Sequence, residues 1–220
     1  MKRYAIITAG GSGVRMGGPL AKQLMEIEGK PILRHTIELF LELSFDVEII
    51  VVINSDLRDM WKSYCKENDF EFRYILTSGG LTRFHSVKNA VKYLERGGVV
   101  AVHDGVRPLA TKGLIERLYT EIESKDALIP VMPVVESLRH ITESRHIDRD
   151  GIVSVQTPQL FRTDVLIDAY KQPYTPAFTD DASVAEATGY NVDITQGERY
   201  NIKITTPEDL LIAKAIFSSR

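Results

Sequence analysis

Short apolar runs alternate with amphipathic segments over the first 131 residues of the chain. The apolar runs are rich in Val and Ile, which is typical of strands buried on both faces of a parallel sheet. They predict strands at 2–8, 47–53, 70–77, 99–102 and 127–131. Between them, apolar residues recur every three or four positions at 32–41 and 112–125, as in a helix with one buried face. This alternation predicts a Rossmann-like α/β fold, with a mostly parallel sheet and helices on both faces.

The pattern changes from 133 to 155, where charges are frequent and a turn-like break falls near 143–145. This segment predicts a protruding two-stranded β-arm. An isolated hairpin is marginally stable and leaves unpaired edges, so we expect the arm to pack against another subunit. The alternative is a mobile surface loop, which would leave apolar residues such as Leu138 and Ile141 in water. We therefore expect a single domain over 1–220, in which this segment serves dimerisation.

Beyond the arm, residues 156–161 return the chain to the core, and Thr163 is a candidate helix cap. A further helix is expected at 179–188. Thr206-Pro207 predicts a helix start, because threonine caps a helix well and proline suits its first turn. Short strands are expected at 192–195 and 201–205.

The amino-acid composition argues against several classes of function. The chain has 220 residues, 44% of them hydrophobic and 26% charged, with a formal net charge of −3. That charge argues against a nucleic-acid binder, which needs a basic surplus. Cys65 is the only cysteine, so no intrachain disulfide or cysteine-based zinc site is expected. Neither a signal peptide nor a membrane-spanning run is recognisable, and we expect a cytoplasmic protein without membrane contacts.

The first predicted strand ends in a loop, 9–22, with five glycines and two cations, Arg15 and Lys22. Glycine lets backbone N–H groups approach a ligand and point into one concavity, which favours an anion. The spacing fits neither the dinucleotide fingerprint nor the P-loop. A plain flexible turn is the alternative, but a turn has no need of the two cations. We expect this loop to bind phosphate through Ala9, Gly10, Gly11, Ser12 and Gly13.

Two more unusual turns, 78–86 and 103–108, also follow predicted strands. Ligands of parallel sheets bind at the carboxyl ends of strands, so all three turns are expected to meet there. Their coincidence indicates a binding site more strongly than any one turn.

The loop motif Ala9–Met16, followed by Pro19, Lys22 and Gln23, resembles the signature of sugar-nucleotide and polyol-phosphate nucleotidyltransferases. Over nearly the whole chain, further motifs fall in the order seen in 2-C-methyl-D-erythritol 4-phosphate cytidylyltransferases. These motifs are Gly79-Gly80 with Arg83 and Ser86-Val87, His103-Asp104-Gly105-Val106-Arg107-Pro108, Asp148-Arg149-Asp150-Gly151, Thr157-Pro158-Gln159, Phe178-Thr179-Asp180-Asp181-Ala182 and Asn201-Ile202-Lys203-Ile204-Thr205.

The resemblance implies transfer of a cytidylyl group from CTP to a sugar-alcohol phosphate, with Mg²⁺ as cofactor, by a homodimer that exchanges its arms. It implies that Arg15 and Lys22 stabilise the transition state. It assigns Arg149 of the partner subunit and Lys203 to the acceptor phosphate. The attacking phosphate is already ionised at neutral pH, so the reaction needs alignment and charge stabilisation rather than a general base.

The remaining site residues have weaker assignments. Gly80 and Ser86 resemble base-side and ribose-side contacts. Asp104, after a buried strand, is a candidate ligand for Mg²⁺ or a substrate hydroxyl. Ser137 and Thr157 are candidates for hydrogen bonds to the acceptor, with a plain strand or turn role as the alternative. Arg83, Arg107 and Thr179 complete the predicted substrate-binding set.

The sequence departs from the family pattern at a few positions, and three alternative functions are considered. Leu81 stands where the family usually has an acidic residue, and Ser137 stands where it often has threonine. The nearest rival is a ribitol-5-phosphate cytidylyltransferase, and a hexose-phosphate nucleotidyltransferase is a second. From a different class, a nucleotide-binding regulator without turnover would share the phosphate loop.

Overall fold

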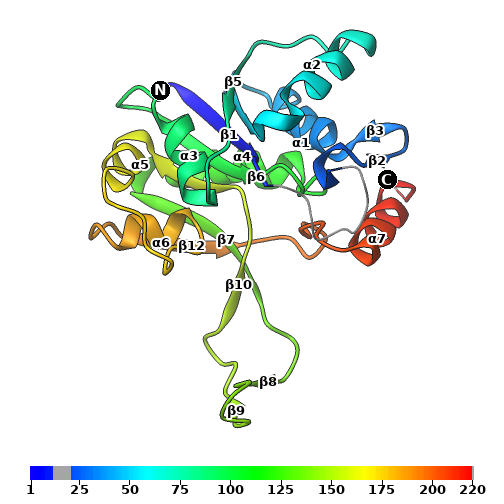
Figure 1. The fold of residues 1–220 in the computed structure, drawn as a ribbon. Coiled ribbons are helices and arrows are strands. Elements are labelled where there is room, and N and C mark those ends of the chain that lie inside the picture. The colour runs from blue at the N-terminus through cyan, green and yellow to red at the C-terminus, as the bar shows by residue number, and fades with distance from the viewer. Residues whose placement is uncertain (12–20, 220) are drawn as a thin grey trace.

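The computed structural model describes residues 1–11 and 21–219. The strands of its main sheet are β1 (Arg3–Ala9), β4 (Glu48–Ile53), β5 (Tyr74–Ser78), β6 (Val99–Asp104), β7 (Ala127–Pro133), β10 (Val153–Val155), β11 (Gln159–Arg162) and β12 (Val192–Gln196). They form an eight-stranded sheet in the order β10-β7-β11-β6-β1-β4-β5, with β12 also paired to β7 (Figure 1). Two small pairs lie outside it: β2 (Glu26–Ile27) with β3 (Lys30–Pro31), and β8 (Leu138–Arg139) with β9 (His146–Ile147).

Helices cover both faces of the main sheet. They are α1 (Ile32–Leu41), α2 (Arg58–Glu67), α3 (Arg83–Val91), α4 (Lys112–Glu121), α5 (Thr163–Ala169), α6 (Asp181–Glu186) and α7 (Pro207–Phe217), with 3₁₀ turns at Lys22–Leu24, Ser55–Leu57 and Ile122–Ser124. Successive strand residues point to opposite faces, so Ile7 packs in the core with α1, α2 and α4, and Ile6 packs in the core with α3, α5 and α6. The predicted Rossmann-like arrangement is confirmed.

Late strands make the sheet mixed. β1 pairs in parallel with β4 and β6, β4 with β5, and β12 with β7. β11, however, lies antiparallel between β6 and β7, and β10 is antiparallel to β7. The sequence pattern predicts a return to the core at 156–161 but no strand, because a four-residue run is too short to show a period.

Several element ends differ from the prediction. The expected strand at 201–205 is wrong: these residues form no ladder, although the Ile204 N–H donates to Val106 O at 2.9 Å. The strand expected from residue 70 starts at Tyr74, because Phe70 and Phe72 pack in an aromatic cluster with Trp61 and Tyr74.

The predicted cap Thr206 is confirmed and the predicted cap Thr163 is wrong; Thr111 caps a further helix. The side chains of Thr111 and Thr206 accept hydrogen bonds from backbone N–H groups at the starts of α4 and α7. Thr163 is inside α5 instead, and its hydroxyl accepts from Gly98 N–H at 3.0 Å. It therefore ties the helix to the start of β6. The helix expected at 179–188 is the shorter α6, capped by Asp180.

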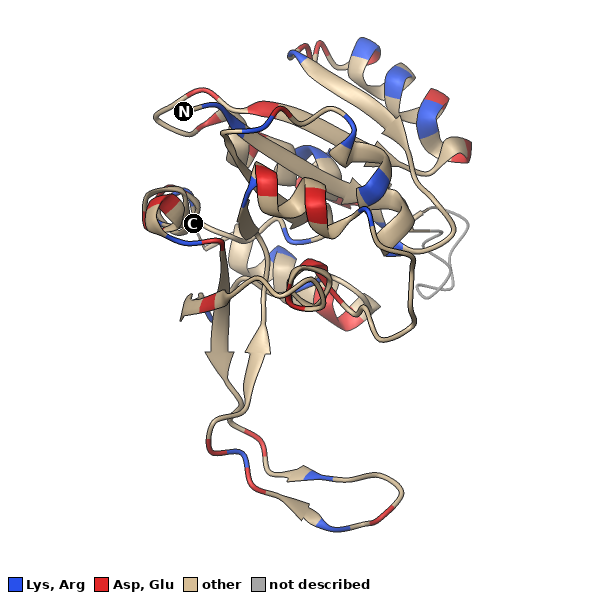
Figure 2. Cartoon of the chain, turned by 90° about the vertical axis from the view of Figure 1, so that its left-hand side faces the viewer, with Lys and Arg blue, Asp and Glu red and all other residues tan. Residues whose placement is uncertain are grey.

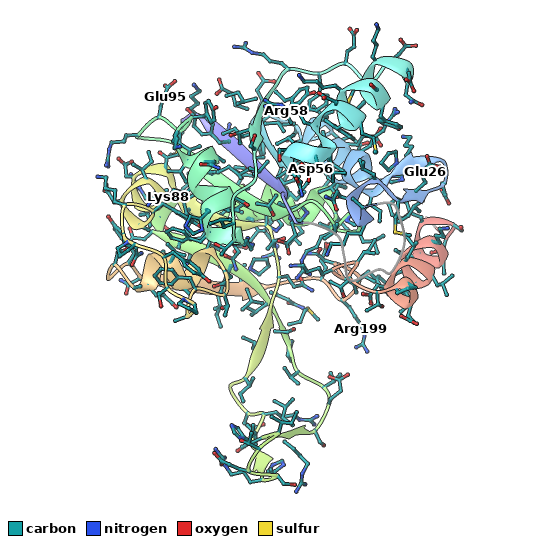
Figure 3. All side chains as sticks on the ribbon, in the orientation of Figure 1. Glu26, Asp56, Arg58, Lys88, Glu95 and Arg199 are labelled. Carbon is teal, nitrogen blue, oxygen red and sulfur yellow. The ribbon has the colours of Figure 1, made fainter. Side chains whose placement is uncertain are left out.

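The segment 133–155 protrudes from the body as an arm, with β8 and β9 at its end (Figure 1). Acidic and basic residues both occur along it (Figure 2), and its side chains project from a narrow ribbon (Figure 3). Val135 is 57% exposed and Ile141 is 94% exposed. The protruding shape is as predicted, and its role in dimerisation stays a prediction, as does the division of the chain into one domain and an arm. None of the helices described is long and apolar enough to cross a membrane.

Candidate functional site

A cavity of about 490 Å³ opens at the carboxyl ends of β1 and β6, where the three unusual turns meet. The position agrees with the general rule for parallel sheets. Of the predicted site residues, those lining this cavity are Ala9, Gly10, Gly11, Lys22, Gly80, Arg83, Ser86, Asp104 and Lys203. The sequence therefore identified most of its wall. The predicted residues Ser12, Gly13 and Arg15 lie outside the described part of the chain.

Gln23 anchors the described ends of the first loop. It is buried, and its amide nitrogen donates to Ala9 O at 3.1 Å and to Gly11 O at 3.0 Å. These bonds hold the end of β1 and the start of the loop against Gln23, the residue that follows Lys22. Gln23 was not among the predicted site residues, although its place beside Lys22 in the sequence signature was the available signal.

The first two turns are in van der Waals contact. A Cβ atom on Gly10 would lie 3.0 Å from Ser86 Oγ and 3.1 Å from Gly79 Cα, and one on Gly80 would lie 2.4 Å from His85 Cβ. Glycine at 10 thus favours the close approach of the two backbones, and glycine at 80 is required within the second turn. Ser86 Oγ accepts from Gly80 N–H and donates to Thr82 O, each at 3.0 Å, which fixes the second turn. A ribose contact by Ser86 stays a prediction.

A second cavity of about 240 Å³ lies beside the first. The predicted residues that line it are Arg83, Asp104, Arg107, Thr157, Thr179 and Lys203. Arg83, Asp104 and Lys203 line both cavities. We call these three residues the shared wall. A group bound in one cavity and a group bound in the other would face the same charged side chains.

Asp104 is the centre of the shared wall and is surrounded by cations. Its Oδ2 lies 3.0 Å from Lys203 Nζ and 3.2 Å from Arg107 Nε, and its Oδ1 lies 3.6 Å from Arg83 Nε. Burial alone would raise the pKa of the Asp104 carboxyl, but the charges of Arg83, Lys203 and Arg107 outweigh it and hold that pKa well below its usual range. Asp104 is therefore ionised, and it keeps the cations in place.

The segment carrying Lys203 is held without a strand ladder. Arg107 Nη1 donates to Asn201 O at 2.8 Å, and the buried Asn201 amide donates to Thr157 O at 2.8 Å. Lys203 then reaches Asp104 from this anchored loop. This ion pair places Lys203 at the shared wall.

His103 lies behind the site rather than in it. Its ring is fully buried between Arg107 O, 3.1 Å from Nε2, and Thr157 Oγ1, 3.0 Å from Nδ1. Burial lowers the pKa of His103 to about 4, so the imidazole is neutral at pH 7. Thr157 Oγ1 also accepts from Asp104 N–H at 3.0 Å. The Thr157 hydroxyl thus supports the wall, and its contact with an acceptor stays a prediction.

Two predicted residues lie in the arm, outside both cavities. Arg149 donates to Val135 O, and Ser137 is exposed. One chain does not bring either of them to the shared wall. The assignment of Arg149 to the site of a partner subunit stays a prediction, as does a hydrogen bond from Ser137 to the acceptor.

The side chains at the site suit an Mg²⁺ ion carried by substrate phosphates better than one coordinated entirely by protein groups. Among residues 1–11 and 21–219 no group of three or more His, Cys, Asp or Glu side chains could hold a metal. Asp104 is the one carboxylate that lines both cavities. Mg²⁺ keeps most of its waters and takes substrate phosphate oxygens plus one or two carboxylates, so a single aspartate suits it.

Comparison with known proteins gives the family. The family model of 2-C-methyl-D-erythritol 4-phosphate cytidylyltransferases matches residues 4–219. The chain belongs to this family. A relative of that name from Bacteroides thetaiotaomicron is 48% identical over 98% of this chain and 100% of its own, and one from Porphyromonas gingivalis is 43% identical over 99% of each.

Solved structures agree over the whole chain. The 4-diphosphocytidyl-2C-methyl-D-erythritol synthase of Anaerococcus prevotii has a TM-score of 0.83 and 28% identity, covering 99% of this chain and 98% of that one. The Francisella tularensis cytidylyltransferase has a TM-score of 0.83 and 31% identity, covering 98% and 99%. Family membership makes this chain a nucleotidyltransferase and confirms the resemblance drawn from the motifs. The ribitol-phosphate alternative is not favoured.

Proposed function

We propose that this chain transfers the cytidylyl group of CTP to 2-C-methyl-D-erythritol 4-phosphate, giving CDP-methylerythritol and pyrophosphate in non-mevalonate isoprenoid biosynthesis. The family match over residues 4–219 supports the reaction. The observation that carries it is the shared wall: Arg83, Asp104 and Lys203 line two adjoining cavities, one floored by the glycine loop. A triphosphate in the first cavity would meet a phosphorylated acceptor in the second.

The proposed step is an in-line displacement. An oxygen of the acceptor phosphate bonds to the α-phosphorus of CTP, and the bond from that phosphorus to the α–β bridging oxygen breaks, so pyrophosphate leaves with the electron pair. The nucleophile is already an anion, and no proton has to move. The buried, neutral His103 agrees with a site that needs no general base.

Stabilisation of charge is the main task of the site. Lys22 lines the glycine-loop cavity, and Lys203 and Arg83 line both cavities. Preorganised donors aimed at developing charge each contribute about 3 kcal/mol of barrier lowering. By family resemblance, Arg15 adds a further cation on the triphosphate. Ala9, Gly10 and Gly11 supply backbone contacts at the cavity floor.

Mg²⁺ is proposed as the cofactor, held by the CTP phosphates with Asp104 as its protein ligand. When bound, it would neutralise phosphate charge. Asp104 Oδ1 is the freer oxygen, because it lies 3.6 Å from Arg83 and its companion oxygen holds both Lys203 and Arg107.

The proposed enzyme is a homodimer with exchanged arms, in which Arg149 and Ser137 reach the partner's acceptor cavity. Three facts support this. Both residues lie outside the cavities of their own chain, the arm protrudes, and its apolar side chains Val135 and Ile141 are exposed. Exposed apolar side chains on a thin hairpin gain stability only from a partner surface.

One assay tests the reaction. Purified protein receives CTP and Mg²⁺ with either 2-C-methyl-D-erythritol 4-phosphate or ribitol 5-phosphate, and pyrophosphate release is measured. We expect turnover with the former; faster turnover of ribitol 5-phosphate would refute the acceptor. Lys22→Ala separates enzyme from regulator, because an enzyme should lose pyrophosphate release by about 100-fold or more. A regulator would release no pyrophosphate in either form.

A further inference from the structure

Arg83 is held by two carboxylates of different burial. Its Nη2 lies 2.5 Å from Asp181 Oδ2, and its Nε lies 3.6 Å from Asp104 Oδ1. Asp181 is fully buried and lines neither cavity, whereas Asp104 lines both. The closer partner of this arginine is thus the carboxylate that no substrate can touch.

Asp181 is itself fixed from several sides. The Tyr170 hydroxyl donates to Asp181 Oδ1 at 2.5 Å, and burial raises the pKa of Tyr170, so this proton stays on the tyrosine. Gln159 Oε1 accepts from the backbone N–H groups of Asp181 and Ala182 at 3.2 and 3.0 Å. The Gln159 amide in turn donates to the helix cap Asp180 at 2.7 Å. The start of α6 is therefore tied to β11 and to the end of α5.

The position of Arg83 matters because Asp104 has other partners. Lys203 and Arg107 both contact Asp104 Oδ2. An Arg83 side chain released from Asp181 would be drawn onto Asp104, since an unpaired guanidinium in this partly buried place takes the nearest carboxylate. It would then compete with Lys203 and withdraw its N–H groups from the cavities.

We propose that Asp181 is a positioning residue that holds the Arg83 guanidinium off Asp104, so that Arg83 and Lys203 both remain directed into the two cavities. Asp181 acts only through Arg83 and touches no substrate. This inference rests on the proposed function for its kinetic readout, because Arg83 is taken to face the reacting phosphates.

A double-mutant cycle tests the link. Asp181→Asn keeps the shape and an acceptor for Tyr170 but removes the charge that Arg83 needs. We expect it to lower kcat/KM for pyrophosphate release by about 10-fold or more in the wild-type background, and by less than about 2-fold in an Arg83→Ala background. A purely structural role for Asp181 would give the same loss in both backgrounds, and that result would overturn the proposal.

Two further variants serve as a control and as a substitute in the double-mutant cycle. Asp168→Asn removes another aspartate that pairs with an arginine, Arg96, at 2.6 Å, but on the surface and outside both cavities, and it should leave kcat/KM unchanged. Tyr170→Phe weakens the fixing of Asp181 while keeping the ring that stacks on Phe84. If Asp181→Asn fails to fold, the same cycle with Tyr170→Phe decides the matter on the same criterion, with an expected loss of about 3-fold.

A structural readout separates this inference from the proposed function. In a crystal structure of Asp181→Asn, or of Tyr170→Phe if that variant is used, we expect Arg83 to have moved toward Asp104. An unmoved Arg83 would overturn the proposal even if the enzyme is a cytidylyltransferase. A moved Arg83 in a protein that releases no pyrophosphate would refute the function and leave the positioning role standing.

Discussion

The shared wall and the arm both carry predicted site residues, but they differ in how firmly neighbouring groups hold those residues. At the wall, the charged side chains are paired with one another: Asp104 is buried, Arg83 is half-buried, and the exposed Lys203 is ion-paired to Asp104. Behind the wall, the buried Asp181 holds Arg83. In the arm, Arg149 and Ser137 are exposed on a thin hairpin. Alignment of two anions needs fixed cations, and the wall provides them within one chain. The arm can hold its cation, Arg149, in a fixed position only when another surface holds the arm.

This difference distinguishes the part of the proposed site that one chain forms by itself from the part that would need a second chain. Substitutions at the wall should change chemistry with little change in assembly, and substitutions in the arm should act through a second chain. Four experiments test that contrast, beginning with the largest expected effect.

Lys203→Met should damage the wall most. It removes a cation shared by both cavities while Arg83 and Arg107 still neutralise Asp104, so the fold is retained. We expect kcat/KM to fall by about 100-fold to 1,000-fold. Pyrophosphate release measures it, with Lys125→Met as control, because Lys125 pairs with Asp193 at 3.0 Å away from the cavities. An equal loss in the control would contradict a special role for Lys203.

Mixed subunits test whether the arm serves another chain. Arg149→Ala and Lys22→Ala proteins should each be nearly inactive. After unfolding and refolding together, a mixed dimer has one site with both side chains intact. In a random mixture, about a quarter of wild-type activity should return. If the mixed dimers form, as native mass spectrometry would show, and activity stays absent, the exchange of arms is wrong.

The pH dependence of stability tests the support behind the wall. The pKa of His103 is lowered from 6.5 to about 4 by burial, so the unfolded chain binds its proton more readily. The stability it contributes is complete above pH 6.5 and is lost as the pH falls toward 4, amounting to about 3 kcal/mol. Urea unfolding at pH 7 and 4.5 measures this change. His103→Gln should flatten it; an unchanged slope in that variant would assign the effect to other groups.

Ile141→Asp should have the smallest effect on the stability of a single chain. Its side chain is 94% exposed, so the free energy of unfolding at low protein concentration should change by less than about 0.5 kcal/mol. Leu128→Ala, at a fully buried position, should cost about 2–5 kcal/mol in the same measurement. Similar losses for the two would mean that the arm belongs to the folded core.

Much of the wall could be predicted because glycine turns and buried strands leave local signals. The residues at 9–11, 78–86 and 103–108 follow strands with clear apolar runs, and the rule that ligands bind at strand ends brings them together. Lys22, Arg83, Asp104 and Lys203 were all identified in this way or by family resemblance.

The missed features depend on contacts between distant segments. β11 has four residues, too few to show a hydrophobic period, and its place between β6 and β7 is set by its pairing with those two distant strands. The segment 201–205 alternates like a strand but finds no neighbouring strand. Asp181 reads as part of a helix start, and only the fold shows that its side chain turns toward Arg83. No local pattern encodes such pairings.

The insertion of β11 between β6 and β7 has a consequence for synthesis on the ribosome. A nascent chain that has emerged only as far as residue 158 has a gap at the middle of its sheet and lacks both Asp181 and Lys203. Its open edges are natural targets for chaperones. We therefore expect translation products that end before Lys203 to lack the proposed activity, because Lys203 lies in the last tenth of the polypeptide.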